Sequence, residues 1–593
     1  KKLFILLSIT IILESIGCFR YAHNNKEKFF FFKGGLALQN KQSEKRVADI
    51  IVEQLAMWGV TAVYGVMGDA IFPLTDALAK QDKIKFYTTR HESTAAFMAS
   101  AHAKLTGQLS VCLATSGPGL ANLLNGLADA SKDRAPVLAL TGQVESYFIG
   151  TDRKQYIDQQ AFISPLAAYS DELAYPDAIV NLLTKAMKSA ITQGKVAHLS
   201  LPKDMLTAMV DVQTRKPEPF LNTPAMSDQA VIFDAIDILN QAKRPVIMVG
   251  RGGLGLTEQV VALAEKMGAG VINTLPAKSV MPYSHPLALG GIGSGGSETA
   301  SKILDQADTL LIIGATWWPK DYTPKQIKIV QIDTVPENIA KNHEVAFGIV
   351  GDAKMLLPQL TQMLAPNSKP EWLETIKDTK EKWDARLYEE VNQGGSPIAP
   401  QRIIYTLQQV IPNNAIITLD VGDHLVWFNR IFQASNQRIL ISGNWRSMGF
   451  GLPAALAAKI AEPKTPVVAV VGDGGLGMVL ADFLTAVYYE LPIIVAVLNN
   501  DCLAMERNRL KFGDMHQLGS GLYNPDFAAF AEICGGVGIK VENSNELEPA
   551  FRRAFNAGKP VILDILTEAA VVPTTKNWPP IPSWSPGTPV AVQ

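Results

Sequence analysis

Short runs of apolar residues recur along residues 45–570, separated by longer stretches with the spacing of helices. The runs at 60–66, 109–115 and 136–142 are examples. A helical pattern at 92–107 lies between the first two of them. Because these runs are continuous and do not alternate with polar residues, both faces of each strand should be buried, as in parallel sheets covered by helices. The sequence therefore predicts an α/β fold of doubly wound parallel sheets.

A chain of 593 residues is too long for one compact domain, and two segments rich in Pro, Thr or Gly divide it. These linkers lie at 213–227 and 392–400. Each of the three units that they separate contains a glycine-rich turn between a strand and a helix. We predict an N-terminal, a central and a C-terminal domain at 41–215, 225–370 and 396–572.

The two ends of the chain do not follow this pattern. Two lysines precede the apolar run 3–13, an arrangement typical of a signal peptide, and the run is shorter than the ~20 residues that span a bilayer. We expect residues 1–40 to be a leader or a non-native extension, and residues 573–593 to be a Pro-rich tail.

The charge balance bears on the class of partner. With 54 basic and 56 acidic residues, the net charge of -2 gives no field that would gather nucleic acid. The 4 cysteines form no C-x-x-C pair, which suits a reducing compartment. We expect a small-molecule substrate, no nucleic-acid partner and a cytoplasmic location. The apolar N-terminal run leaves membrane association open, but the folded domains do not indicate it.

The segment 471–478, "VGDGGLGM", follows one of the apolar runs. Its glycines Gly472, Gly474 and Gly477 have the spacing of a dinucleotide-binding loop, yet Asp473 stands between the first two. A helix N-terminus binds phosphate, whereas an adjacent carboxylate repels it unless a divalent cation lies between them. The loop therefore favours a bound metal ion together with a diphosphate.

A second metal ligand should come from a neighbouring strand end. The next apolar run, 491–498, leads directly into Asn499, Asn500 and Asp501. Since the carboxyl ends of parallel strands meet at one edge of a sheet, Asn500 should lie near Asp473. Two alternatives remain open: a dinucleotide site, for which Asp501 lies too far along the chain, and a simple turn in which Asp473 caps the next helix.

The G-D-G sequence followed at this interval by N-N resembles the motif of thiamine diphosphate-dependent enzymes. The resemblance to the acetohydroxyacid synthase and pyruvate oxidase family extends over most of residues 45–570. It implies that Asp473, Asn500 and the backbone carbonyl of Cys502 hold Mg²⁺ in a diphosphate-binding C-terminal domain. The cofactor-binding residues that it implies in this domain are Gly422, Asp423, His424, Met448, Gly472, Gly474 and Gly475.

The N-terminal domain resembles the family's pyrimidine-binding domain. Glu92 lies in a segment similar to the family pattern R-H-E-x-x-A-A. In the family, this glutamate binds the aminopyrimidine ring of thiamine diphosphate and helps to remove the proton from the reactive C2 carbon of the cofactor. From the residues alone, Glu92 could instead be stabilised at the start of a helix. Asn122 ends a segment similar to the cofactor-binding loop S-G-P-G-x-x-N, and Gln143 matches a residue near the reacting carbon.

The central domain contains a second G-x-G-x-x-G sequence, at Gly250, Gly252 and Gly255, with Arg251 after the first glycine. Its surroundings resemble the flavin-binding domain of pyruvate oxidases, and the resemblance implies bound FAD. Asp333, at a strand end, is the expected ribose partner. The residues implied to bind FAD are Gly250, Gly252, Gly253, Thr274, Gly290, Gly314, Asp333 and Asp352. The alternative is a domain that kept this fold without a flavin.

Several features guide the choice of reaction. None of the 8 histidines forms the adjacent pair typical of simple decarboxylases in this superfamily. The turn "ATWWP" at 315–319 is similar to the turn of the oxidases. Two positions depart from the family pattern: Tyr156 replaces a glutamate, and Arg509 stands where synthases usually have tryptophan.

The reaction favoured by the sequence is oxidative decarboxylation of a 2-oxo acid with FAD as electron acceptor, and pyruvate is the favoured substrate. The alternative is an acetolactate synthase-type carboligase that condenses two 2-oxo acids. A non-catalytic family member is disfavoured because Glu92, Asp473 and Asn500 are all present. In the family, Glu92 and the G-D-G loop of one site come from different subunits, which implies a homodimer or homotetramer.

Overall fold

The computed structural model describes residues 44–218, 229–293, 295–316, 322–366, 368–392 and 395–570. The predicted leader at 1–40, the predicted tail at 573–593 and the two tryptophans of the "ATWWP" turn lie outside the described residues.

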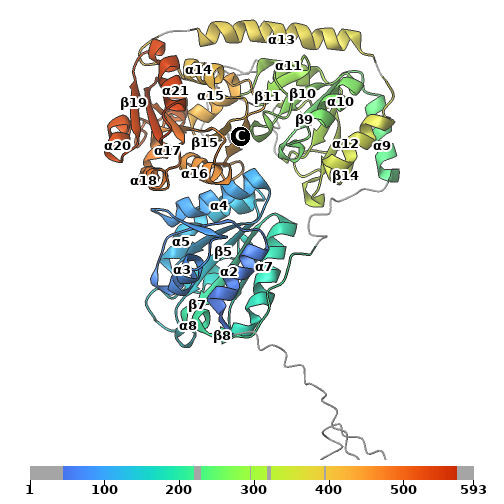
Figure 1. Cartoon of the computed structure of the whole chain (residues 1–593). Helices are drawn as coiled ribbons and strands as arrows, with labels where there is room; N and C mark the ends of the chain where they lie inside the picture. The colour runs from blue at the N-terminus through green and yellow to red at the C-terminus, as the bar shows by residue number, and fades with distance from the viewer. Residues whose placement is uncertain are drawn as a thin grey trace, which may run out of the picture.

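Three parallel sheets of six strands each form the described part of the chain, one in each third (Figure 1). The N-terminal sheet has the order β3-β2-β4-β5-β7-β6, the central sheet β11-β10-β9-β12-β13-β14 and the C-terminal sheet β16-β15-β17-β18-β20-β19. A short antiparallel pair joins β1 (Lys45–Arg46) to β8 (Met209–Val210). The predicted fold class is therefore confirmed.

The strands of the N-terminal sheet are β2 (Ala62–Gly65), β3 (Lys85–Thr88), β4 (Ser110–Ala114), β5 (Val137–Gln143), β6 (Ala167–Glu172) and β7 (Val196–Pro202). Those of the central sheet are β9 (Pro245–Val249), β10 (Gly270–Asn273), β11 (Ala288–Gly291), β12 (Thr309–Ile313), β13 (Lys328–Asp333) and β14 (Phe347–Val350). Those of the C-terminal sheet are β15 (Ile416–Leu419), β16 (Arg438–Ile441), β17 (Val467–Gly472), β18 (Ile494–Asn499), β19 (Val537–Val541) and β20 (Val561–Leu566).

Helices cover both faces of each sheet (Figure 1). Those of the N-terminal domain are α2 (Val47–Met57), α3 (Phe72–Ala79), α4 (Glu92–Thr106), α5 (Pro118–Lys132), α6 (Gln159–Ile163), α7 (Ile179–Gln193) and α8 (Lys203–Thr207). Those of the central domain are α9 (Gln229–Asn240), α10 (Thr257–Met267), α11 (Glu298–Gln306) and α12 (Ala353–Met363), and α13 (Pro370–Val391) leads from it to the C-terminal domain. Those of the C-terminal domain are α14 (Pro400–Val410), α15 (Asp423–Ile431), α16 (Gly451–Ala461), α17 (Asp473–Gly477), α18 (Phe483–Tyr488), α19 (Ala504–Phe512), α20 (Phe527–Ile533) and α21 (Leu547–Phe555).

The N-terminal and C-terminal domains share one hydrophobic core, although they are far apart in the sequence. Helix α4 of the first packs against α16 of the second, as Figure 1 shows at the boundary between the two domains. Both helices are rich in alanine, which allows close approach, and Phe97 meets Phe450 edge-on with ring centroids 5.9 Å apart. Burial of this shared apolar surface holds the two domains together.

A buried ion cluster strengthens the same boundary. The Lys104 ammonium lies 2.6 Å from an Asp129 carboxylate oxygen and 2.7 Å from one of Asp133, and it donates to the Ile441 carbonyl at 3.0 Å. Asp133 in turn accepts from the Gly443 amide at 2.7 Å. Because these charges are paired as well as buried, removal of one partner should be costly.

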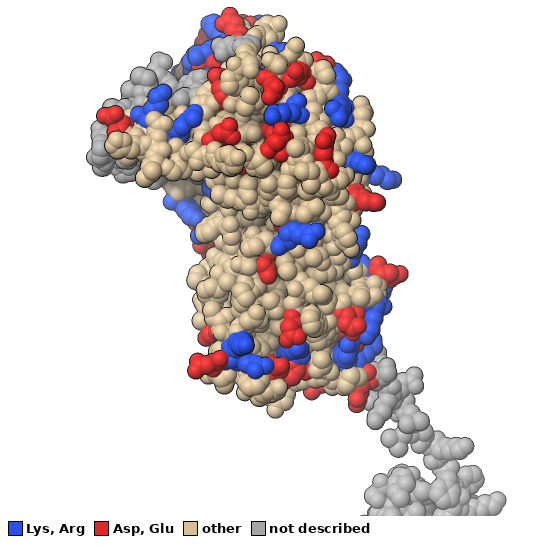
Figure 2. Space-filling view, turned by 90° about the vertical axis from the view of Figure 1, so that its left-hand side faces the viewer, with Lys and Arg blue, Asp and Glu red and all other residues tan. Residues whose placement is uncertain are grey.

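The surface shows no gathering of one charge on the face seen in Figure 2, where basic and acidic side chains are interspersed. Within the described ranges, none of the helices combines the length and the apolar character needed to cross a bilayer.

In the central domain, the loops that follow β9 and β12 cross each other at glycines. Gly314 has a φ of +57°, and a Cβ atom on it would lie 2.4 Å from the Cα of Gly252. A Cβ on Gly250 would lie 2.4 Å from the Gly314 carbonyl oxygen. The G-x-G spacing is thus required by the crossing of two backbones, whatever ligand the loops bind.

Gly314→Ala should therefore destabilise the fold by about 3 kcal/mol or more, because it adds backbone overlap to the cost of a left-handed conformation. Gly558→Ala is the matched control, since Gly558 has a φ of +62° and no heavy atom within 4 Å of the added Cβ. Its loss should stay near 1–2 kcal/mol, roughly the left-handed penalty alone. Urea unfolding followed by circular dichroism measures both. Equal losses would contradict the crossing as the reason for Gly314.

Candidate functional site

A small cavity lies at the carboxyl edge of the C-terminal sheet, where β15, β17 and β18 end. Its volume is about 100 Å³. The structure brings together here every residue predicted for the diphosphate and the metal ion. These are Gly422, Asp423, His424, Met448, Gly472, Asp473, Gly474, Gly475, Asn500 and Cys502.

Asp473 is the first residue of α17, and Gly472 occupies the N-cap position. Its side chain therefore does not cap the helix in the way that the simple-turn alternative required. The residue is 3% exposed. One carboxylate oxygen accepts from the Gly474 amide at 3.0 Å and the other from Asn524 Nδ2 at 2.8 Å. Burial raises the pKa of this carboxyl group.

The loop after β18 places Asn500 and Cys502 beside Asp473. Asp501 has a φ of +53°, and the turn that it makes allows Asn500 Oδ1 to accept from the Cys502 amide at 3.2 Å. Asn524 Nδ2 connects this loop to Asp473, since it also lies 3.1 Å from Asn499 Oδ1 and 3.0 Å from Asp501 Oδ1. Asn524 was not among the predicted site residues, because no spacing links it to either motif.

No cluster of three or more His, Cys, Asp or Glu side chains suited to a metal ion occurs in the part of the chain that the structure describes. A metal ion at this edge would therefore take amide or carbonyl oxygen beside one carboxylate. Mg²⁺ accepts such ligands and keeps several oxygen positions for phosphate or water.

His424, in the first turn of α15, has hydrogen-bonding capacity that the chain does not use. Its Nε2 is buried and has no partner among the described residues, and burial lowers the pKa of the ring to about 4. A Cβ on Gly422 or Gly472 would lie 2.9 or 3.1 Å from ring atoms, so both glycines make room for the imidazole. Trp427 Nε1, on the same helix, is also buried without a partner in the described part of the chain, and Trp427 lines the same cavity. Free polar atoms in a glycine-lined hollow fit an anionic ligand with its cation.

Asp420, at the end of β15, organises the loops around this cavity. It accepts from the Val421 amide at 2.7 Å, the Gly449 amide at 2.9 Å and the Gly451 amide at 3.2 Å, and burial raises its pKa to about 6. A Cβ on Gly475 would lie 2.9 Å from its carboxyl carbon. Asp420 thus fixes the loop of Met448 against the G-D-G loop. Asp420 stands two positions before Gly422, but nothing in the sequence indicates that its carboxylate is buried and bonded to three amides.

The three predicted residues of the N-terminal domain lie elsewhere. Glu92 begins α4, and Asn122 Nδ2 donates to its carboxylate at 2.9 Å, so the structure pairs two residues that the sequence assigned separately. Gln143, at the end of β5, is fully buried and donates to the Ile157 carbonyl at 3.0 Å. None of the three lines either cavity described here.

A much larger cavity, of about 1310 Å³, lies between the central domain and the other two. Of the residues predicted to bind FAD, six line it: Gly250, Gly252, Thr274, Gly314, Asp333 and Asp352. Gly253 and Gly290 do not line it. A Cβ on Gly253 would meet Val249, and one on Gly290 would meet Ser297.

The lining of the large cavity carries more positive than negative charge. Its basic members are Lys104, Lys132, Arg134, Lys195, Arg251, Lys341, Arg446 and Arg509, and its acidic members are Asp133, Asp333, Glu337, Asp352 and Glu506. Asp333 accepts from the Val335 amide at 2.9 Å and from Asn338 Nδ2 at 3.1 Å, while Asp352 is the N-cap of α12.

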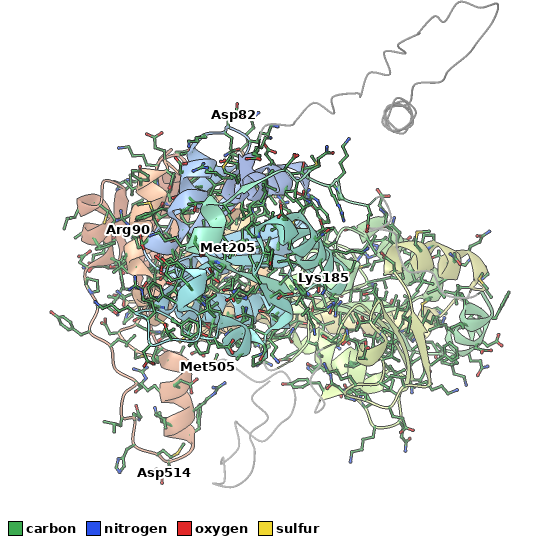
Figure 3. The ribbon with its side chains drawn as sticks, turned by 90° about the horizontal axis from the view of Figure 1, so that it is seen from below. Asp82, Arg90, Lys185, Met205, Met505 and Asp514 are labelled. Atoms are coloured by element: carbon green, nitrogen blue, oxygen red, sulfur yellow. The ribbon has the colours of Figure 1, made fainter. Side chains whose placement is uncertain are left out.

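The two cavities adjoin, since Val421, Gly422, Met505 and Glu506 line both. Two of these residues come from α19. Figure 3 shows this helix projecting from the body of the molecule, with Met505 at its near end and Asp514 beyond its far end. Arg509 lies on the same helix, where its guanidinium is 2.9 Å from Glu506.

Comparison with known protein families gives three matches, one in each of the three domains. The N-terminal, central and C-terminal domains of thiamine pyrophosphate enzymes match residues 45–162, 232–360 and 420–565.

Full-length relatives agree with these matches. The chain is 35% identical over 549 residues to the "Putative thiamine pyrophosphate-containing protein YdaP" of Bacillus subtilis, with 91% of this chain and 93% of that protein covered. It is 33% identical over 553 residues to the "Probable acetolactate synthase large subunit" of Methanocaldococcus jannaschii, with 88% and 92% covered. It is 32% identical over 546 residues to the acetolactate synthase large subunit of Corynebacterium glutamicum, with 88% and 86% covered. The chain therefore belongs to the thiamine pyrophosphate-dependent enzymes of the acetohydroxyacid synthase and pyruvate oxidase family.

Proposed function

We propose that this enzyme decarboxylates a 2-oxo acid and joins the remaining fragment to a second 2-oxo acid, as an acetolactate synthase-type carboligase. The observation that carries this proposal is that relatives named acetolactate synthase align with the chain over nearly the whole length of both proteins. Their names support carboligation better than the oxidation of pyruvate that we favoured from the sequence alone.

The C-terminal cavity is the proposed site of the thiamine diphosphate headgroup. Asp473, Asn500 Oδ1 and the Cys502 carbonyl would hold Mg²⁺, which offsets the repulsion between the carboxylate and the diphosphate. The backbone of Gly474 and Gly475 and the unused Nε2 of His424 would face the phosphate oxygens.

Thiamine diphosphate, once bound, supplies an acidic carbon that adds to the carbonyl of a 2-oxo acid. Within this chain, Glu92 is the proposed proton-handling group, because its carboxylate stands at the start of a helix with Asn122 beside it. The Asn122 amide would orient this carboxylate toward the aminopyrimidine ring. A closed site around them would exclude water from the reacting carbon.

The separation of Glu92 and Asn122 from the metal-side residues of the same chain supports assembly of the chain into an oligomer. Glu92 and Asn122 line neither cavity, whereas the metal-side residues are gathered in one. A complete site would then need Glu92 from one subunit and the G-D-G loop from another. We propose a homodimer or homotetramer on this ground.

The large cavity is the proposed site of FAD. Its volume suits a dinucleotide, which is larger than the ligands of typical 300–1,000 Å³ pockets. Its excess of basic residues suits a pyrophosphate, and Asp333 stands at the strand end where a ribose would bind. The purified protein should then be yellow and release about one flavin per chain on denaturation. A colourless protein that consumes pyruvate would contradict this assignment.

Incubation with pyruvate, thiamine diphosphate and Mg²⁺ tests the proposed reaction. We expect acetolactate to accumulate at half the molar amount of pyruvate consumed, because two 2-oxo acids combine with loss of one CO₂. Product analysis by mass spectrometry, with flavin absorbance recorded in parallel, measures both outcomes. Acetate formation with reduction of the flavin, and no acetolactate, would show oxidation instead.

Asp473→Ala and Asn500→Ala should each weaken the binding of thiamine diphosphate with Mg²⁺ by about 100-fold, because the diphosphate then meets an incomplete metal shell. Titration calorimetry measures the affinity. The matched control is Asp501→Asn, since Asp501 is an exposed neighbouring carboxylate and asparagine tolerates its positive φ. Unchanged affinity in both test variants would remove Asp473 and Asn500 from the metal site.

Mixing of two inactive variants tests the shared site. Asp473→Ala and Glu92→Gln chains should each be inactive, and a mixture that has exchanged subunits should recover about a quarter of the activity. Recovery occurs because a mixed dimer has one site with two intact halves. Proof of exchange by native mass spectrometry, with no recovery of activity, would contradict sites formed between subunits.

A further inference from the structure

Asp482 is a buried carboxylate that the reaction proposed above does not use. It ends a short helical turn, η9 (Leu480–Asp482), which directly follows α17 and the G-D-G loop. The residue is 1% exposed. Asp482 belongs to the C-terminal domain, and its hydrogen-bond partners show which other residues this segment contacts.

Two of the three partners come from the N-terminal domain, on either side of Glu92. The Arg90 amide donates to Asp482 Oδ1 at 2.8 Å, and the Thr94 hydroxyl donates to Oδ2 at 2.6 Å. The third partner, the Thr485 hydroxyl, lies in the C-terminal domain and donates to Oδ1 at 2.8 Å. The Asp482 carboxylate thus accepts hydrogen bonds from residues on both sides of Glu92, and Thr485 fixes it within its own domain.

A second contact supports the same arrangement. The Thr88 amide donates to the hydroxyl of Tyr489 at 2.8 Å, and the rings of Tyr87 and Tyr489 meet edge-on with centroids 4.9 Å apart. The end of β3 and the start of α4 are therefore both attached to the segment that follows the G-D-G loop.

We propose that Asp482 is a positioning residue for Glu92, which sets the place of this carboxylate relative to the cofactor. The inference rests on the function proposed above. Without Asp482, the buried Thr94 hydroxyl would have no acceptor and the Arg90 amide would lose its partner, so the segment 90–94 would move to satisfy them. Proton transfer depends steeply on geometry, so a displacement of roughly 1 Å is enough to slow it.

The chain offers a matched pair of variants. Thr94→Val and Thr485→Val each remove one hydroxyl from the same carboxylate and keep nearly the same side-chain shape. Thr94 and Thr485 are both buried. Only Thr94 lies on α4, the helix that begins with Glu92, whereas Thr485 lies on α18 of the C-terminal domain. A purely structural role of the carboxylate would make the two variants equivalent, whereas a positioning role would not.

The readout is exchange of the C2 proton of enzyme-bound thiamine diphosphate into D₂O, followed by NMR, with cofactor affinity measured separately by calorimetry. We expect Asp482→Asn and Thr94→Val to slow exchange by about tenfold or more with affinity within about twofold of wild type. Thr485→Val should change exchange by less than about threefold. Equal effects of the two threonine variants, or wild-type exchange in Thr94→Val, would overturn the inference. Wild-type protein that fails to bind the cofactor or to exchange would instead overturn the proposed function.

Discussion

The proposed metal and diphosphate site is built around the buried carboxylate of Asp473. A negative side chain inside a glycine-rich loop is unfavourable next to a diphosphate unless a cation lies between them. The structure keeps Asp473 buried and raises its pKa, while Asn500 and the Cys502 backbone stand beside it. Asp420 and Asn524 connect the surrounding loops through hydrogen bonds to Gly449 and Asp473. The arrangement fits the metal and diphosphate site proposed above, and the match of residues 420–565 to the C-terminal domain of thiamine pyrophosphate enzymes supports that proposal.

The second constraint is the shared core of the N-terminal and C-terminal domains. Because α4 packs on α16, the start of α4 and its Glu92 are fixed against the C-terminal domain of the same chain. Yet Glu92 does not reach the cavity of that domain. The same packing that makes the chain rigid thus separates the two halves of the chemistry, and this separation is the physical reason to propose sites between subunits.

The sequence predicted those features that depend on local pattern or on the geometry of parallel sheets. Continuous apolar strands predicted the three sheets, and the meeting of parallel strand ends predicted that Asp473 and Asn500 lie together. The place of Gly422 beside them was implied only by the family resemblance. Contacts between distant segments carry no such pattern. For this reason the contact of Asn122 with Glu92 and the roles of Asp420 and Asn524 emerged only from the structure.

The glycines of the central domain show a further limit of pattern reasoning. Their spacing indicated a ligand-binding loop, but the crossing of the loops at Gly252 and Gly314 already requires glycine. The same glycines can both bind a ligand and allow two backbones to cross. The presence of the motif alone therefore does not identify the ligand. The choice between carboligation and oxidation meets the same difficulty, because both reactions would use the same cofactor-binding motifs.

A crystal structure with thiamine diphosphate and Mn²⁺ in place of Mg²⁺, with anomalous scattering used to locate the metal ion, tests the role of Asp473. We expect one strong peak per chain, coordinated by Asp473, Asn500 Oδ1, the Cys502 carbonyl and the diphosphate. A bound cofactor whose diphosphate lies elsewhere, or a metal ion without Asp473 as a ligand, would contradict this expectation.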